Sequence, residues 1–134
     1  MTYPGRPFGI TALGFFFLFG AVMSGLAAVM LLFPGSMLDP LWRLNPHARS
    51  GFAAIGLWAV LLMLVVCVAC GTAALGLQRC KRWGYWTALT ILAINLAGDA
   101  ANALIAHDWH TLIGLPIGGA MIVYLLTKRS AFAD

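Results

Sequence analysis

Three polar side chains with the types and spacing to do chemistry lie within one apolar stretch of the sequence. Asn95, Asp99 and Asn102 occupy positions i, i+4 and i+7. On an α-helix these positions fall within about 60° of one another, so the three side chains form one polar stripe. A carboxyl group between two amides can bind a proton or a polar ligand, and the same groups can hold neighbouring helices together through hydrogen bonds. The sequence alone leaves both interpretations open.

Asp99 is the ionisable residue that falls well inside a predicted membrane span. A charged Asp at the centre of a bilayer costs about 2.5–3.5 kcal/mol on insertion scales. We therefore expect Asp99 to face other helices, to pair with a cation or to carry a proton. Arg43 and Arg49, in a long loop nearer the N-terminus, are the candidate cations if that loop folds back over the helices.

Two histidines, His107 and His110, follow the polar stripe and extend the set of candidate ligand- or proton-binding residues. Two histidines hold a metal only with a third and a fourth ligand, and the remaining histidine, His47, lies in a different loop. Asp108, between them, is well placed to cap the helix that follows. The sequence therefore predicts no metal site and no cofactor, and it assigns no catalytic residue.

A Cys-x-x-Cys pair, Cys67 and Cys70, has the spacing of thiol oxidoreductases. A reactive thiolate needs a polar or electropositive setting, whereas this pair lies within Leu-Val-Val-Cys-Val-Ala-Cys-Gly. We therefore expect both cysteines to act as small hydrophobic side chains.

The composition places these residues in a membrane protein. Hydrophobic residues make up 62% of the 134 residues and charged residues 9%, whereas a soluble domain has about a quarter of its residues charged. A chain of this length could not bury so much apolar surface in a water-soluble core, so most of that surface must face the lipid bilayer. The net charge of +4 comes from too few charges to form the basic face that a nucleic-acid partner requires.

Four apolar stretches must position the polar residues, at about 8–33, 52–77, 85–106 and 111–127. A helix needs about 20 apolar residues to cross a membrane, and the fourth stretch is at the lower limit. Lipid offers no partner for unpaired backbone groups, so we expect α-helices. The loops after the second and third stretches are tight, which favours antiparallel neighbours. The predicted fold is one all-α domain, 1–134, an antiparallel four-helix transmembrane bundle.

The first loop is long enough for a further element. Leu38, Leu41 and Trp42 stand at i, i+3 and i+4, which predicts a short helix lying in the membrane interface.

Positive charges set the predicted orientation, because cytoplasmic loops carry an excess of Lys and Arg. With the N-terminus inside, the other side carries two such residues, Arg43 and Arg49. The cytoplasmic side then carries Arg6, Arg79, Lys81, Arg82, Lys128 and Arg129. We therefore expect a multi-pass inner-membrane protein with its N-terminus and C-terminus in the cytoplasm.

Small residues in the last apolar stretch predict close helix packing. The Gly114 and Gly118 spacing lets a neighbouring helix approach, and Pro116 removes one backbone hydrogen bond. Broken helices also expose carbonyl groups to ligands in transporters. We favour packing against the polar stripe.

The segments Arg82-Trp-Gly-Tyr85, Asn95-Leu-Ala-Gly-Asp-Ala-Ala-Asn102 and Thr111-Leu-Ile-Gly-Leu-Pro-Ile-Gly-Gly119 together resemble a pattern in small bacterial four-span inner-membrane proteins. The resemblance covers mainly the C-terminal half. It implies four spans and a bacterial inner membrane, and it brings no activity. In length and span count alone, the chain also resembles DoxX-like proteins.

Three function classes remain open. The first is a non-enzymatic accessory or scaffold protein, or a ligand-binding protein, whose partner is another membrane protein or a second copy. The second is a small homo-oligomeric transporter or proton-coupled protein in which Asp99 titrates. The third is a membrane enzyme with an Asp and His site built from Asp99 and His107 or His110. We favour the first class, because it requires nothing beyond the residues present.

Overall fold

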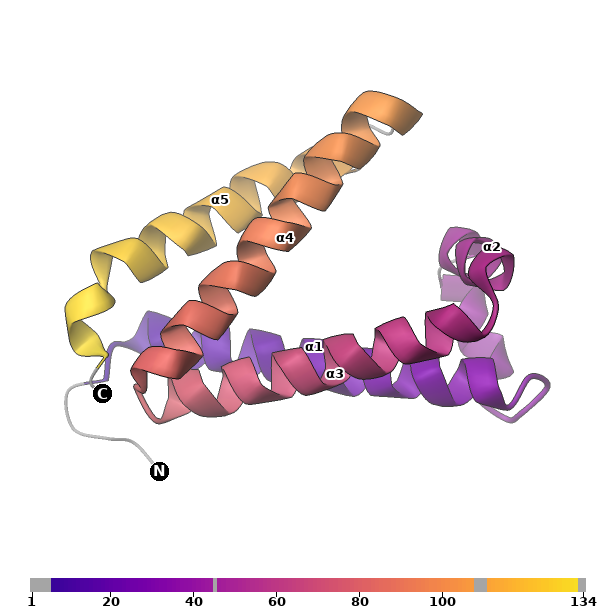
Figure 1. Ribbon diagram of the computed structural model, residues 1–134, viewed down its shortest axis with the longest axis horizontal. Helices are drawn as coiled ribbons and strands as arrows, with labels where there is room; N and C mark the ends of the chain where they lie inside the picture. Colours follow the sequence, from indigo (N-terminus) through magenta and orange to yellow (C-terminus); the bar gives the residue numbers. More distant parts are fainter. Residues whose placement is uncertain (1–5, 45, 108–110, 133–134) are drawn as a thin grey trace.

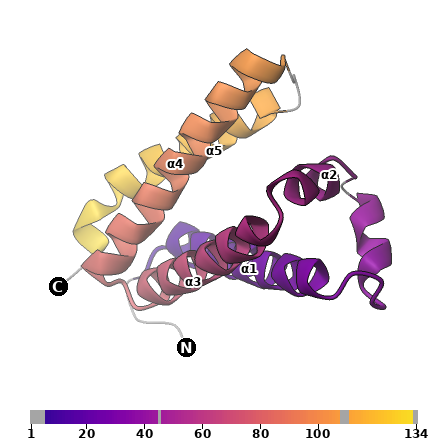
Figure 2. The same ribbon diagram turned by 45° about the vertical axis from the view of Figure 1, so that its right-hand side comes forward.

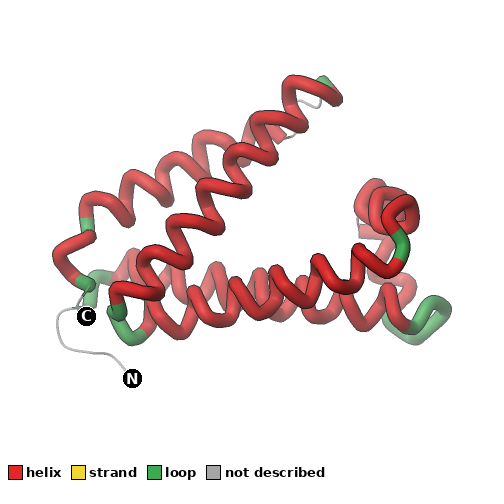
Figure 3. Tube along the Cα trace, in the orientation of Figure 1, coloured by secondary structure: helices red, strands yellow, loops and turns green. Residues whose placement is uncertain are grey.

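The computed structural model describes residues 6–44, 46–107 and 111–132, and within these ranges the chain is helical with no β-strand. Short loops join the helices, as Figure 3 shows in green. The helices in chain order are α1 (Phe8–Leu32), η1 (Asp39–Leu44), α2 (Pro46–Ile55), α3 (Leu57–Gln78), α4 (Arg82–Ala106), α5 (Thr111–Thr127) and η2 (Arg129–Ala131). The predicted all-α fold class is therefore confirmed.

Three of these helices, α1, α3 and α4, are long and apolar enough to cross a membrane. The fourth candidate, α5, is apolar but has 17 residues. At 1.5 Å per residue it is about 26 Å long, slightly less than the thickness of the hydrocarbon core. The long apolar helices identify a membrane protein.

The long helices form two pairs that meet at one end and diverge toward the other. In Figures 1 and 2, α1 lies beside α3 and α4 lies beside α5, and the pairs join near the turn from α3 into α4. At the opposite end, α2 covers the α1–α3 pair while the α4–α5 pair points away (Figure 1). The helices thus do not form a closed bundle along their whole length.

The junction depends on two glycines whose backbones touch. A Cβ added to Gly76 of α3 or to Gly84 of α4 would overlap the backbone of the other helix. The turn between them closes with a hydrogen bond of 2.9 Å from the Lys81 amide to the Gly76 carbonyl. Arg6 also donates to the carbonyl of Gln78, which ties the start of α1 to the end of α3. These contacts hold α1, α3 and α4 together at one end.

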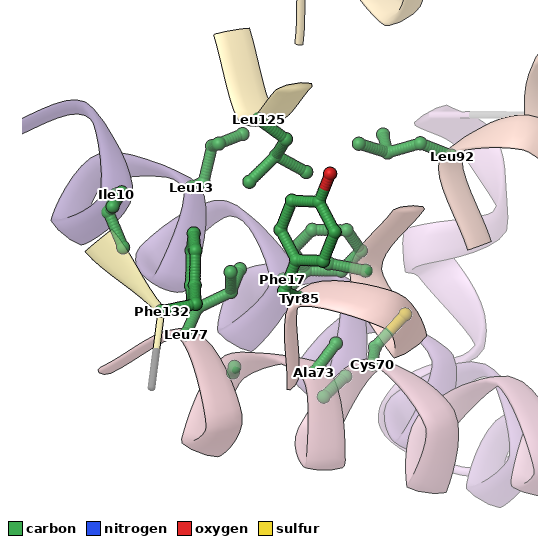
Figure 4. Packing of buried hydrophobic residues seen from close by; sticks show 13 residues of the cluster. Ile10, Leu13, Phe17, Cys70, Ala73, Leu77, Tyr85, Leu92, Leu125 and Phe132 are labelled. Carbon is green, nitrogen blue, oxygen red and sulfur yellow. The ribbon is translucent and has the colours of Figure 1, made fainter. Parts of the chain in front are cut away.

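The hydrophobic core includes residues next to the turn from α3 into α4, such as Leu77 and Tyr85. Figure 4 shows its side chains from close by. Its largest fully buried side chains come from four helices: Ile10 and Phe17 of α1, Leu77 of α3, Tyr85 of α4 and Leu125 of α5. After η2 the chain returns, and the ring of Phe132 packs 5.1 Å from that of Tyr85, centroid to centroid. On α4 the last buried hydrophobic residue is Leu92, and the later residues of that helix whose burial is described contribute none to the core.

The α1–α3 pair fits together through glycines and cysteines. A Cβ on Gly25 would lie 3.3 Å from the Cys67 sulfur, and one on Gly20 would lie 3.6 Å from the Cys70 sulfur. Each thiol therefore fills a notch that a glycine leaves in α1. All three cysteines are free. The positions agree with the expectation that Cys67 and Cys70 act as small hydrophobic side chains.

The second predicted span begins later than the sequence suggested. The stretch 52–77 was expected to be one helix, but Gly56 adopts a φ of +61° and separates α2 from α3. Hydropathy cannot detect this break, because the residues on both sides of the glycine are apolar. Of the short helix expected around Leu38, Leu41 and Trp42, the structure has the 3-10 helix η1, which includes Leu41 and Trp42 but begins after Leu38. Trp42 packs on Phe52 of α2 with ring centroids 6.0 Å apart.

Candidate functional site

The polar stripe of α4 lies in two different environments. Asp99 is half-buried where α4 meets α5, and a Cβ built on Gly114 would stand 2.9 Å from its Oδ2 atom. Asn95 and Asn102 are exposed on the surface of the helix pair. The stripe therefore faces a neighbouring helix at its centre and leaves both amides unpartnered by α5.

Small residues of α5 make room for α4 at two levels. Gly114 receives the Asp99 carboxyl group, and a Cβ on Gly118 would lie 3.2 Å from the Cδ1 atom of Leu96. The helix continues through Pro116, which is exposed. The two glycines thus lie on the face of α5 that contacts α4, and the carboxyl group occupies space that a larger side chain would fill.

The amides of Asn95 and Asn102 make no hydrogen bond to any other residue that the structure describes. Between them, Gly98 has open space where its Cβ would stand. Large apolar side chains flank this face, with Ile94 65% exposed and Ile105 82% exposed. Exposed carboxamides on an otherwise apolar helix are costly in lipid unless another group satisfies them.

The cations proposed as partners of Asp99 lie elsewhere. Arg49 of α2 approaches Asp39 of η1, with its Nη2 atom 3.5 Å from Oδ2. Arg43, on η1, is exposed. Both arginines belong to the segment that covers the α1–α3 pair, and among the described residues Asp99 has no ion-pair partner. The loop folds onto its own helix pair and not onto the stripe.

Of the two candidate histidines, the structure describes only His107. His107 is exposed and ends α4 in the left-handed conformation, with φ of +52°. His110 lies outside the described residues, as does Asp108. Within the described ranges no three side chains among His, Cys, Asp and Glu come together in a group that could hold a metal. The described stripe offers the hydrogen-bonding groups of two carboxamides and one carboxyl group.

A second feature, which the sequence did not suggest, is an apolar groove of about 610 Å³ on the α1–α3 pair. It is bounded by α1, α3, η1 and α2, and Met23, Met30 and Met63 line it together with Trp42 and Phe52. Methionine side chains adapt readily to irregular spaces. The sequence feature that could have indicated this groove is the pair of aromatic residues Trp42 and Phe52. Hydropathy alone does not distinguish such a pair from aromatic residues that anchor a helix in the membrane interface.

Comparisons with protein-family models, curated proteins and solved structures give no match for this chain. The two resemblances noted from the sequence therefore remain predictions. What the protein does must be inferred from its own residues.

Proposed function

We propose that the protein is a non-enzymatic accessory or scaffold protein of a bacterial inner membrane, and that its α4–α5 pair binds a further component within the bilayer. The observation that carries this proposal is the exposure of Asn95 and Asn102 on an apolar helix that could span the membrane. Polar side chains between membrane helices stabilise their association. An exposed amide pair without any other recognisable chemistry favours binding over catalysis.

The proposal includes four spans, with α5 as the fourth and both chain ends in the cytoplasm. Two observations support it. The start of α1 and the end of α5 lie at the same end of the molecule, beside the turn from α3 into α4 (Figure 1). That end carries the basic residues Arg79, Lys81 and Arg82, whereas Arg43 and Arg49 lie at the other end. A reporter enzyme that is active only outside the cytoplasm should therefore be inactive when it is fused to the C-terminus.

A second candidate function is supported by Asp99. A half-buried carboxyl group without an ion pair among the described residues, packed where two helices meet, is suited to binding a proton. In that case the protein would be a small homo-oligomeric transporter or a proton-coupled protein. Asp99→Asn would then abolish flux and leave assembly intact, whereas an accessory protein would keep its phenotype as long as assembly is unchanged.

The first experiment is native mass spectrometry of the protein extracted gently from its own membrane. We expect a stoichiometric complex, and we expect the double variant Asn95→Leu, Asn102→Leu to lose it. The matched control is Thr90→Val, because the Thr90 hydroxyl lies on the same helix and already donates to the Trp86 carbonyl at 2.8 Å. A bare monomer in the wild type, or a complex that the double variant retains, would overturn the proposal.

A further inference from the structure

Asn95 and Asn102 belong to a regular pattern along α4. They are seven residues apart. Ile91 lies four residues before Asn95, and Gly98 lies three residues after it. Ile105 lies three residues after Asn102. We call these five residues the α4 seam. Alternating steps of three and four residues are the spacing at which two helices pack along a shared line, and the heptad repeat gives a left-handed crossing.

The seam continues a face of α4 that is already used for helix packing. Gly84 and Ala88, seven residues before Ile91 and Asn95, are buried at the junction, where Gly84 touches α3. Toward the end of α4 the two helix pairs diverge (Figure 2), and there the same face has no neighbouring helix within the part of the chain that the structure describes. Only 11% of the apolar core of α4 is buried, compared with 33% for α3. From Asn95 onward the seam is therefore the exposed extension of a packing surface, whereas Ile91 at its start is partly buried against the core.

The seam is also complementary to itself. A carboxamide has both hydrogen-bond donors and acceptors, so two identical amides can satisfy one another. Copies of one protein inserted in the same direction are related by a twofold axis along the membrane normal, which places each residue at the depth of its own counterpart. Around such an axis Asn95 meets Asn95 and Asn102 meets Asn102.

Gly98 lies at the level where such a contact would be tightest. The asparagine side chain is short, so two amides can meet only if the helix backbones come close. Gly98 stands between the two asparagines, and apart from its own helix backbone and chain neighbours no described atom lies within 4 Å of the position of its Cβ. It offers the space for that approach, and Ile105, which is 82% exposed, supplies apolar contact beside Asn102.

We infer that the α4 seam binds the α4 seam of a second copy of this protein in the same membrane, with each asparagine paired to its counterpart. The inference rests on the proposed function, because it names the component that the α4–α5 pair binds. A partner with only donors would leave the NH2 group of each amide unsatisfied, and a partner with only acceptors would leave its carbonyl group unsatisfied. The amides of a second copy satisfy both groups.

The test uses the full chain, labelled with donor and acceptor fluorophores in separate batches and mixed in phosphatidylcholine and phosphatidylglycerol vesicles. Energy transfer should rise with the protein-to-lipid ratio. The double variant Asn95→Leu, Asn102→Leu should weaken association by about tenfold, as expected for interhelical hydrogen bonds. Gly98→Leu should weaken it further, and Thr90→Val should not change it. Equal association of all four proteins would overturn the inference.

Cross-linking then tests the geometry. With Cys67, Cys70 and Cys80 replaced by alanine, Ile105→Cys should form a disulfide-linked dimer under mild oxidation, whereas Thr90→Cys on another face should not. Linkage at position 90 alone would overturn the inference. If the wild-type chain stays monomeric in vesicles but extraction from native membranes yields a complex with a different protein, this inference fails while the proposed function stands. If neither association is found, both fail.

Discussion

The two helix pairs solve the problem of packing in a membrane in different ways. In the α1–α3 pair, 28% and 33% of the apolar core residues of the two helices are buried, and the thiols of Cys67 and Cys70 fill notches left by glycines. In the α4–α5 pair, 11% of the core of α4 is buried, and the contact includes the carboxyl group of Asp99. The first pair uses apolar fit, whereas the second places polar groups inside and on its surface.

This difference indicates which part of the molecule is complete in itself. The outer end of the α1–α3 pair is covered by η1 and α2, with Trp42 buried to 8% exposure. The outer end of the α4–α5 pair has no such cover among the described residues, and its exposed amides have no partner there. A helix pair with unsatisfied polar groups in lipid requires a further protein surface that supplies hydrogen-bond partners, whereas the apolar pair requires none.

The largest effect is expected where the two pairs join. Gly76→Leu would place a side chain in the backbone of Gly84, which cannot move without separating α3 from α4. We expect a loss of at least about 3 kcal/mol in the free energy of unfolding, measured by denaturant titration in micelles. Gly71→Leu is the matched control, because it lies on the same helix with no described atom near its Cβ position. Equal stability of the two variants would contradict a backbone contact at the junction.

Removal of the cover from the apolar pair should have the next largest effect. Trp42→Ala deletes a buried indole that packs on Phe52, and we expect a loss of about 3 kcal/mol. Trp58→Ala is the control, because Trp58 is 73% exposed. Association through the α4 seam should not change in either variant. If Trp42→Ala weakened that association, the two pairs would not be independent.

The contact within the second pair should be sensitive to a single methyl group. Gly114→Ala places a Cβ 2.9 Å from the Asp99 carboxyl oxygen, so that side chain must shift, and we expect a loss of about 1 kcal/mol in the same titration. Gly119→Ala, in the same helix with open space at its Cβ position, should be neutral or slightly stabilising. Restoration of stability by combining Gly114→Ala with Asp99→Ala would identify the carboxyl group as the cause.

The smallest effect is expected at the ion pair between Arg49 and Asp39. The Arg49 side chain is 57% exposed, so Asp39→Asn should cost less than about 1 kcal/mol, and high salt should reduce the cost further. Thermal unfolding at low and high ionic strength measures it. A loss as large as that of Trp42→Ala would show that charge, and not the indole, holds η1 and α2 in place.

Much of the helical framework could be predicted from hydropathy alone. The limits of α1 and α5 agree with the predicted stretches to within one residue, and α4 differs by three residues at its start. The start of α3 could not be predicted, because Gly56 interrupts an apolar run through its backbone conformation and not through its polarity. A positive φ at a glycine leaves no signature in hydropathy.

The residues of the candidate site could be predicted from the sequence, but their exposure and their neighbours could not. The i, i+4, i+7 spacing placed Asn95, Asp99 and Asn102 on one face of a helix, which the helical structure of α4 supports. Periodicity does not say how far two helices stay together, so the divergence of the pairs, and hence the exposure of the amides, was not predictable. Arg49 was a candidate partner of Asp99. In the structure Arg49 approaches Asp39, an acidic residue of the same loop, and that pair was not predicted from the sequence.

The divergence of the two pairs gives the molecule unequal cross-sections at its two ends (Figure 2). If both pairs span a bilayer, as proposed, this shape occupies more area in one leaflet than in the other. Bending that expands the wider leaflet relieves crowding around the open end, and bending in the opposite sense compresses it. In that arrangement, the splay of the helices would make the angle between the pairs responsive to membrane curvature, without any ligand.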